Sequence, residues 1–496
     1  MSRQRPLLVP AAPAAPDGPG GQAVHLRFDE ALIEATAHDT LATALIAAGV
    51  LMTSRSPKYR RPRGPYCLTG DCGTCLVRID GRPNVRACMT PVREGMRVSS
   101  QNSYRPKRLD PTQLVDTLFP GGIDHHHLMV RPRIVNQVMQ EVARNLTGFG
   151  ELPEGVDTSG YEYLAHELPV LIIGAGPAGQ AAAAVFEAAG VDHVIVDRLD
   201  RAALAANLDD AESRAHAQPA KLLADTGVFG IYPGPHMLFP GREDDLALVA
   251  ASERHPNLER LHAFRPHHLM FCVGSRDPML PFPNNDLPGI VSARGLIRAL
   301  RRANARIAGP CLVVGEGPWA HAQLNALDQL RAPHAPKLEL IAPNQIERAV
   351  GGERIEALIC HGGRRSCALL AIAQTPASAH ELAAQIGVAL GFNGGGFGID
   401  RAHEAGDHGR CGALGGTSLW AAGDVCIGVD PAAGQAAAAR DGARVAKAVL
   451  EVLAAAPHEL PDATHFAPAE PPQPPTMRER PVVGDRFAEP AAKEPS

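Results

Sequence analysis

Four cysteines stand close together in the segment YCLTGDCGTCLVRIDGRPNVRAC. They are Cys67, Cys72, Cys75 and Cys88, with the spacing C-x4-C-x2-C-x12-C. A [2Fe-2S] cluster needs four thiolates, and this spacing lets one loop wrap three sulfurs around the irons while the fourth arrives from a later element. Gly70 and Gly73 supply the backbone freedom that such wrapping requires. The segment therefore predicts a [2Fe-2S] site. The alternatives are unligated thiols or a structural zinc site, although zinc sites usually show two C-x2-C pairs.

A glycine-rich turn follows a predicted buried strand at residues 170–173 and opens an Ala-rich helix. Its residues are Gly174, Gly176, Pro177, Ala178 and Gly179. In such a turn the first glycine permits the tight bend, the second lets backbone amides approach a pyrophosphate, and the third lets the helix pack close to the sheet. A second predicted strand ends about twenty residues later in Asp197, whose carboxylate would accept hydrogen bonds from an adenosine ribose. The alternative is a turn kept only for packing.

Which dinucleotide binds there is indicated by the distant segment TSLWAAGDVCIGVDPAAGQAAAARDGARVA. A strand that ends near Gly423 and Asp424 precedes a Gly/Ala-rich helix. This pattern resembles the second flavin motif of two-dinucleotide-domain flavoproteins, in which the aspartate binds the flavin ribityl chain. The resemblance favours FAD over NAD, and an ordinary exit from a strand is the alternative.

A second glycine-rich turn, at Gly315 and Gly317, lies between the two flavin motifs. Glu316 places a carboxylate where a pyrophosphate would lie, and Trp319 adds bulk beside it. The next predicted strand runs into Ala342 and a proline, where a ribose-reading acid or arginine would be expected. We expect a degenerate structural domain here, with NAD(P) or adenine-nucleotide binding as the alternatives.

These motifs need a small β-rich module and an α/β flavoprotein with two dinucleotide-binding domains built on doubly wound parallel sheets. The predicted organisation is a disordered lead at 1–22, a ferredoxin-like domain at 23–102, a connector at 103–165 that contains a helix at 134–146, an FAD-binding domain at 166–290 and 385–453, an inserted second dinucleotide-binding-like domain at 291–384, and a Pro-rich tail at 454–496. The three histidines at 125–127 are expected to be connector or interface residues, because adjacent side chains cannot all face one metal ion.

Composition excludes several classes of function. The 496 residues include 48 basic and 53 acidic side chains, a net charge of -5, so nothing supports nucleic-acid binding. The most apolar stretch, 168–186, is interrupted by glycines and a proline and is too short to span a membrane. The N-terminal segment lacks the continuous apolar core of a secretory signal, and we therefore expect a cytoplasmic protein.

The run SRSPKYRRPRG, the cysteine segment and the run NVRACMTPVREGMRVSSQN resemble the ferredoxin-like module of heterotetrameric sarcosine oxidase alpha subunits. They are also similar to the small ferredoxin-like subunits of hydrogen cyanide synthase and opine dehydrogenase. The similarity continues through FPGGIDHHHLMVRPR and the dinucleotide-binding region, over roughly residues 25–453.

This resemblance implies an electron-transfer subunit that carries FAD and a [2Fe-2S] cluster. The amine or amino acid (sarcosine, proline, glycine or an opine) would be oxidised on a separate beta subunit that resembles D-amino-acid oxidase and holds its own FAD. In keeping with this division, no residue set predicts a catalytic base for amine oxidation, and no C-x2-C pair in 168–453 provides a redox disulfide. Two alternatives stay open: a self-contained NAD(P)H-dependent flavoenzyme like a ferredoxin reductase, and a scaffold subunit with purely structural nucleotide sites.

Overall fold

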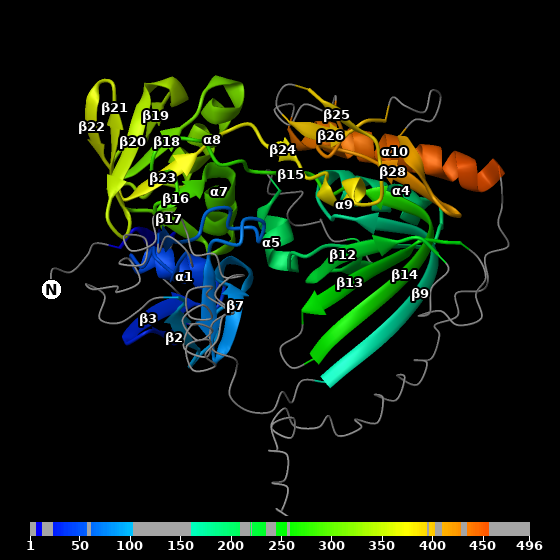
Figure 1. The fold of residues 1–496 in the computed structure, drawn as a ribbon, viewed down its shortest axis with the longest axis horizontal. Coiled ribbons are helices and arrows are strands. Elements are labelled where there is room, and N and C mark those ends of the chain that lie inside the picture. Colours follow the sequence, from blue (N-terminus) through cyan, green and yellow to red (C-terminus); the bar gives the residue numbers. More distant parts are fainter. Residues whose placement is uncertain are drawn as a thin grey trace, which may run out of the picture.

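Three principal sheets organise the described part of the chain in the computed structural model (Figure 1). The described residues are 6–11, 23–56, 61–102, 160–208, 219, 221–234, 245–254, 258–393, 396–401, 409–427 and 434–455. Across these ranges, none of the helices has the length and apolar character needed to cross a membrane. The predicted helix at 134–146, the histidines at 125–127 and residues 456–496 of the tail lie outside them.

The ferredoxin-like domain is a five-stranded sheet in the order β3-β2-β8-β6-β7. Its strands are β2 (Ala23–Phe28), β3 (Ala31–Thr36), β6 (Leu76–Ile79), β7 (Arg82–Arg86) and β8 (Arg97–Ser100). Every second residue of β2 is buried, as expected for a strand with one face on a core. The turn between β6 and β7 consists of Asp80 and Gly81, with φ of 47° and 88°, the positive values that a type I′ hairpin needs. Helix α1 (Leu41–Ala47) packs on this sheet, and the Thr40 hydroxyl caps its N-terminus.

The largest sheet forms what we term the nucleotide domain. Its strands are β9 (Gly160–Ile173), β10 (His193–Val196), β11 (Leu222–Leu223), β12 (Thr226–Tyr232), β13 (Leu248–Arg254), β14 (Leu258–Phe271), β27 (Arg410–Leu414) and β28 (Thr417–Ala421). The strands β11, β10, β9, β14 and β28 are parallel neighbours in that order, and β12, β13 and β27 add antiparallel edges. One face is covered by α4 (Pro177–Ala188), α5 (Arg201–Ala206) and α10 (Gln435–Ala455).

The inserted domain has a four-stranded parallel sheet in the order β16-β23-β18-β19. Its elements are β16 (Ile290–Ser292), α7 (Ala293–Arg302), β17 (Ala305–Ile307), β18 (Cys311–Val314), α8 (Gly317–Gln329), β19 (Glu339–Ile341), β20 (Ile346–Gly351), β21 (Ile355–Cys360), β22 (Gly363–Ser366) and β23 (Leu369–Ile372). Strands β20, β21 and β22 form an antiparallel layer. Two parallel sheets with helices thus confirm the predicted two-dinucleotide-domain architecture.

Short elements complete the described chain. They are β4 (Ser54–Arg55) paired with β5 (Pro62–Arg63), η1 (Ala87–Met89), β15 (Ser275–Arg276) paired with β24 (Ala377–Ser378), η2 (Pro343–Gln345), α9 (Glu381–Ala384), and β25 (Leu390–Phe392) paired with β26 (Phe397–Ile399). The chain passes between the nucleotide and inserted domains twice, once at β15 and once at β24, and these two strands pair with each other.

Residues 6–11, the described part of the lead at 1–22, differ from the expectation of disorder. Strand β1 (Leu8–Pro10) pairs antiparallel with β17 of the inserted domain. Leu7 and Leu8 are buried in a core that the inserted and ferredoxin-like domains share. The expectation rested on the composition of the whole Pro/Ala-rich segment, and composition does not indicate that three consecutive residues can pair with a strand far away in the sequence.

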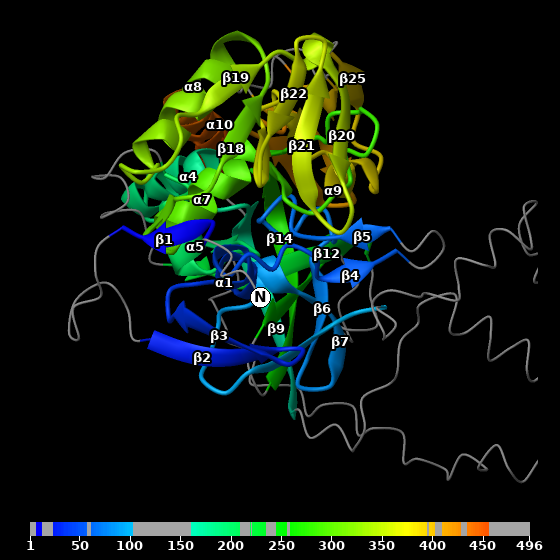
Figure 2. The same cartoon turned by 90° about the vertical axis from the view of Figure 1, so that its left-hand side faces the viewer.

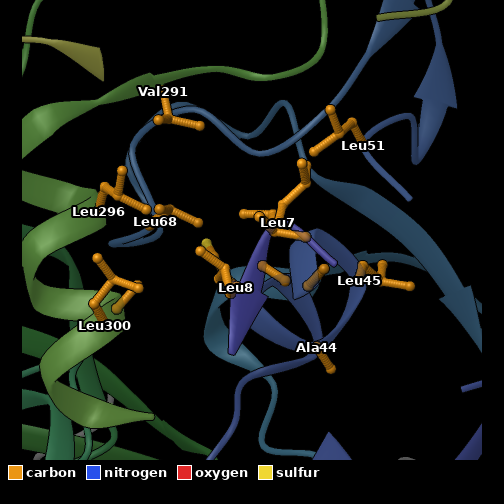
Figure 3. Close-up of a cluster of buried hydrophobic side chains, with 14 of the residues drawn as sticks. Leu7, Leu8, Ala44, Leu45, Leu51, Leu68, Val291, Leu296 and Leu300 are labelled. Atoms are coloured by element: carbon orange, nitrogen blue, oxygen red, sulfur yellow. The ribbon is translucent and has the colours of Figure 1, made fainter. Parts of the chain in front are cut away.

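The ferredoxin-like domain lies directly below the inserted domain (Figure 2). A single hydrophobic cluster includes residues of both, and Figure 3 shows Leu7 and Leu8 between Leu45 of α1 and the α7 residues Leu296 and Leu300. The cysteine loop is therefore fixed from two sides, by its own sheet and by α7.

Candidate cofactor sites

The four predicted cysteines come together at one end of the ferredoxin-like sheet. The Sγ atoms of Cys75 and Cys88 are 3.4 Å apart. The Sγ of Cys67 accepts backbone N–H groups from Thr69 at 3.5 Å, from Asp71 at 3.2 Å and from Cys72 at 3.4 Å. Inward-pointing amides of this kind stabilise negative charge on sulfur, the charge that a metal-bound thiolate carries. Positive φ values at Leu68, Gly70 and Gly73 turn the loop around these sulfurs.

The thiols also interact with one another. The pKa of Cys67 is lowered by its hydrogen bonds with the Cys72 and Cys88 thiols, and the pKa of Cys75 is lowered by its hydrogen bond with Cys88. The same hydrogen bonds raise the pKa values of Cys72 and Cys88. Cys67 thus interacts with Cys72 and Cys88, and Cys88 with Cys75, and four sulfurs linked in this way suit a group with two irons and four thiolate ligands. Within the described ranges, three or more His, Cys, Asp or Glu side chains do not converge on a point that one metal ion could occupy.

The three glycines of the first turn have different surroundings. Gly174 has a φ of 103°, and a Cβ there would overlap the carbonyl oxygen of Cys272. A Cβ on Gly179 would overlap the carbonyl oxygen of Gly174, because α4 packs tightly on the sheet. A Cβ on Gly176 would meet nothing within 4 Å, so the turn is open on the side where a pyrophosphate would approach. Pro177 begins α4, where a proline costs no hydrogen bond.

Asp197 follows β10 and lies against this turn. Its two carboxylate oxygens accept the backbone N–H groups of Ala175 and Leu199, both at 2.8 Å. Burial raises the pKa of Asp197 above its ordinary value, although these two N–H groups oppose the rise. The carboxylate is thus held at the end of β10, where the ribose of a dinucleotide would meet it.

Asp424 lies at the same edge of the sheet, just after β28. Its Oδ2 accepts the Ser275 hydroxyl at 3.3 Å, and its carbonyl oxygen accepts the Ser378 hydroxyl at 2.8 Å. Gly423 has a φ of 79° and donates its N–H to Asp441 on α10 at 2.8 Å. Strand order places Asp197 and Asp424 three strand spacings apart, about 14 Å at ~4.8 Å per spacing. That separation suits the two halves of one extended dinucleotide.

The sequence does not indicate several residues that hold Asp424 and Gly423 in place at this edge of the sheet. Arg294 on α7 donates to the Ser275 hydroxyl at 2.9 Å and to its carbonyl oxygen at 2.8 Å, and it is ion-paired with Asp277 at 2.8 Å. Asp441, which holds Gly423, has a lowered pKa: burial alone would raise it, but the Gly423 N–H and the charge of Arg401 outweigh burial. Sequence spacing cannot reveal such partners, because each pair joins different elements.

The cysteine loop contacts residues beside this edge of the sheet. Arg198, which follows Asp197, is ion-paired with Asp71 of the loop at 2.6 Å. On the other side, a Cβ on Gly295 of α7 would overlap the carbonyl oxygen of Cys67, next to Arg294. The loop therefore contacts Arg198, which follows Asp197, and Gly295, which follows Arg294; Arg294 is connected to Asp424 through Ser275.

A small pocket with a volume of about 30 Å³ lies where the three domains meet. The ferredoxin-like domain contributes Thr69 and Cys88, the nucleotide domain Asp200, and the inserted domain Arg302. Arg302 is ion-paired with Asp200 at 2.5 Å, which ties the inserted domain to the segment after Asp197.

The second glycine-rich turn belongs to the inserted domain and lies between β18 and α8. Gly317 has a φ of 77° and begins α8, and Glu316 precedes it at the N-cap without a side-chain capping bond. Glu316 is exposed, so its carboxylate lies at the helix N-terminus, where a pyrophosphate would otherwise bind.

Comparison with known proteins agrees with this arrangement. Residues 21–103 match the model of the 2Fe-2S iron-sulfur cluster binding domain, and residues 167–216 match that of an FAD binding domain. Sarcosine oxidase subunit alpha of Rhizobium meliloti (strain 1021) is 30% identical over 294 residues, which are 55% of this chain and 30% of the relative. Hydrogen cyanide synthase subunit HcnA of Pseudomonas aeruginosa is 41% identical over 71 residues, 14% of this chain and 67% of the relative. The chain belongs to the alpha-type FAD/[2Fe-2S] oxidoreductase subunits.

FAD and a [2Fe-2S] cluster are accordingly the cofactors of this alpha-type subunit. The chain spans about 30% of the length of the matched sarcosine oxidase alpha subunit. Among solved structures, L-proline dehydrogenase from P. horikoshii has a TM-score of 0.62 at 16% identity, covering 91% of this chain and 76% of that one. This likeness shows that the fold is shared.

Proposed function

We propose that this alpha-type subunit relays electrons between its FAD and its [2Fe-2S] cluster within a larger amine or amino-acid oxidase or dehydrogenase. The observation that carries the proposal is the contact of the cysteine loop with residues beside the sheet edge that carries Asp197 and Asp424. Asp71 pairs with Arg198, which follows Asp197, and Cys67 lies against Gly295, next to Arg294, which reaches Asp424 through Ser275. Electron transfer needs such proximity.

In this proposal Cys67, Cys72, Cys75 and Cys88 together hold the two irons. The 3.4 Å separation of the Cys75 and Cys88 Sγ atoms and the hydrogen bonds of Cys67 with the Cys72 and Cys88 thiols support this set of ligands. Bound FAD exchanges electrons in pairs or singly, and a [2Fe-2S] cluster exchanges one at a time, so together they divide a two-electron oxidation into single steps.

The FAD-binding roles follow the surroundings of each residue. Gly174, whose N–H donates to the Val196 carbonyl oxygen, makes the tight bend. The backbone amides of Gly176, Ala178 and Gly179 face the pyrophosphate, and Pro177 fixes the start of α4. Asp197 binds the adenosine ribose, and Asp424, in a turn fixed by Gly423, binds the ribityl chain. Ser275 and Arg294 orient Asp424.

We further propose that a beta subunit resembling D-amino-acid oxidase, with its own FAD, oxidises the substrate, an amine of the sarcosine, proline, glycine or opine type. The similarity to sarcosine oxidase and hydrogen cyanide synthase subunits supports this division. We place the complex in the cytoplasm, since unpaired thiols such as the buried Cys311 and Cys426 persist in a reducing compartment.

The test is anaerobic purification of the full chain, alone and co-expressed with a candidate beta subunit that resembles D-amino-acid oxidase. We expect separable flavin and iron–sulfur absorption bands, both reducible, and reduction of the cluster by the amine only when the beta subunit is present. Cys75→Ser should remove the iron–sulfur band, whereas the control Cys311→Ser, a buried thiol of β18, should keep it. A preparation without iron or flavin contradicts the proposal. Rapid flavin reduction of the isolated chain by NADH or NADPH would instead favour a self-contained reductase.

A further inference from the structure

Arg198 connects the nucleotide domain to the cysteine loop. It follows the ribose-facing Asp197, and its Nη2 lies 2.6 Å from Oδ1 of Asp71. Its backbone is also fixed, because the guanidinium of Arg254 donates to the Arg198 carbonyl oxygen at 2.8 Å. The nucleotide domain thus positions Arg198, whereas its partner Asp71 belongs to the ferredoxin-like domain.

Asp71 contacts both Arg198 and a cluster cysteine. Its backbone N–H donates to Cys67 Sγ at 3.2 Å, and its side chain accepts the Thr69 hydroxyl at 2.8 Å as well as the Arg198 guanidinium. The same residue that stabilises charge on a cluster sulfur is therefore held in place by an arginine of another domain. Hydrogen bonds to the sulfurs and nearby charge both change the potential of an iron–sulfur cluster.

The electrostatics of Arg198 agree with this geometry. Burial by itself would lower the pKa of its guanidinium, but the carboxylates of Asp71 and Asp197 and the charge on Cys67 raise it. The side chains of Arg198 and Asp71 are 46% and 26% exposed, so the ion pair adds little to the stability of the fold. The Arg198–Asp71 pair instead changes the charge beside the Cys67 sulfur.

We propose that Arg198 is a positioning residue through which the nucleotide domain sets the reduction potential of the [2Fe-2S] cluster. Reduction adds one negative charge to the cluster, and a cation beside Cys67 stabilises that charge. Loss of the Arg198 charge therefore lowers the potential, and loss of the Asp71 charge raises it. The inference rests on the proposed electron-relay function and specifies one residue that tunes it.

The experiment is a redox titration of the full chain loaded with FAD and cluster, followed by electron paramagnetic resonance, at low ionic strength. Arg198→Gln should lower the equilibrium constant for cluster reduction about tenfold, which is about 59 mV for a one-electron couple. Asp71→Asn should shift the potential in the opposite direction. Arg198→Lys keeps the charge and should restore most of the wild-type value. Arg93→Gln is the matched control, because Arg93 pairs with Asp80 inside the ferredoxin-like domain.

The opposite signs separate an electrostatic role from a structural one. Both variants break the same ion pair, so a purely structural role would shift the potential the same way in each. Equal shifts, or none, with full cluster content would overturn the proposal. If Arg198→Gln holds no cluster, Asp71→Asn and Arg198→Lys decide the matter by the same signs. Failure of the relay function itself would look different, as wild-type protein that lacks a reducible flavin or cluster. The shifts should also shrink as salt is added, because the pair is partly exposed.

Discussion

At the scale of single residues, the glycines of the first turn serve different purposes. Gly179 lets α4 approach the sheet, since a Cβ there would overlap the carbonyl oxygen of Gly174. Gly176 has an ordinary φ of -73° and open space around it. The fold requires the glycine at 179, whereas at 176 only a ligand can require it.

This difference predicts separate outcomes for two alanine variants. Gly179→Ala should lower the melting temperature strongly, because backbone must move to relieve the overlap. Gly176→Ala should keep the wild-type melting temperature of the FAD-free chain and bind FAD at least tenfold more weakly, because the methyl group occupies the pyrophosphate path. Thermal unfolding of the FAD-free chain and fluorescence titration with FAD measure the two effects. Wild-type FAD affinity in Gly176→Ala would mean that the pyrophosphate lies elsewhere.

What could be predicted at this scale follows from how local each signal is. The cysteines and turn glycines act with neighbours a few residues away, so spacing identifies them. Ser275 and Arg294 act on Asp424, about 150 and 130 residues further along the chain, and Arg198 acts on Asp71 across two domains. Only the packed structure brings these partners together.

At the scale of elements, β1 shows where composition misleads. The strand is three residues long, yet it pairs with β17 along its whole length and buries Leu8 to 4% exposure. The parallel strands of the nucleotide domain were predicted correctly, because a strand buried on both faces is apolar throughout its length. A short strand in a Pro/Ala-rich segment has no such pattern, and its partner lies almost 300 residues away.

We therefore expect Leu8→Ala to destabilise the protein by about 2 kcal/mol, since truncating a buried leucine loses transfer free energy and leaves a cavity. Leu32→Ala is the control, because Leu32 lies on β3 with 66% of its surface exposed and should change stability by less than about 0.5 kcal/mol. Urea denaturation of the two variants measures the difference. Equal stabilities would show that β1 does not contribute to the folded core in solution.

At the scale of the whole molecule, the ferredoxin-like and inserted domains share one core, while the nucleotide domain has cores of its own. The cysteine loop lies at this shared boundary, with α7 against Cys67. Two domains far apart in the sequence thus form one structural unit around the cluster. Ion pairs such as Arg198–Asp71 and Arg302–Asp200 connect the nucleotide domain to that unit.

This division predicts that cluster and flavin are lost at different points of unfolding. Leu296 of α7 is fully buried in the shared core, and Leu269 of β14 is fully buried in the nucleotide domain. Each leucine-to-alanine change should cost about 2–5 kcal/mol. Leu296→Ala should lower the urea concentration at which the iron–sulfur absorption bleaches more than the one at which flavin is released. Leu269→Ala should do the reverse, because its cavity lies under the parallel strands that carry the flavin turns. Equal shifts of both transitions in both variants would instead mean that the three domains unfold as one cooperative unit. The polar contacts between the nucleotide domain and the other two domains would then couple the domains as tightly as the shared core does.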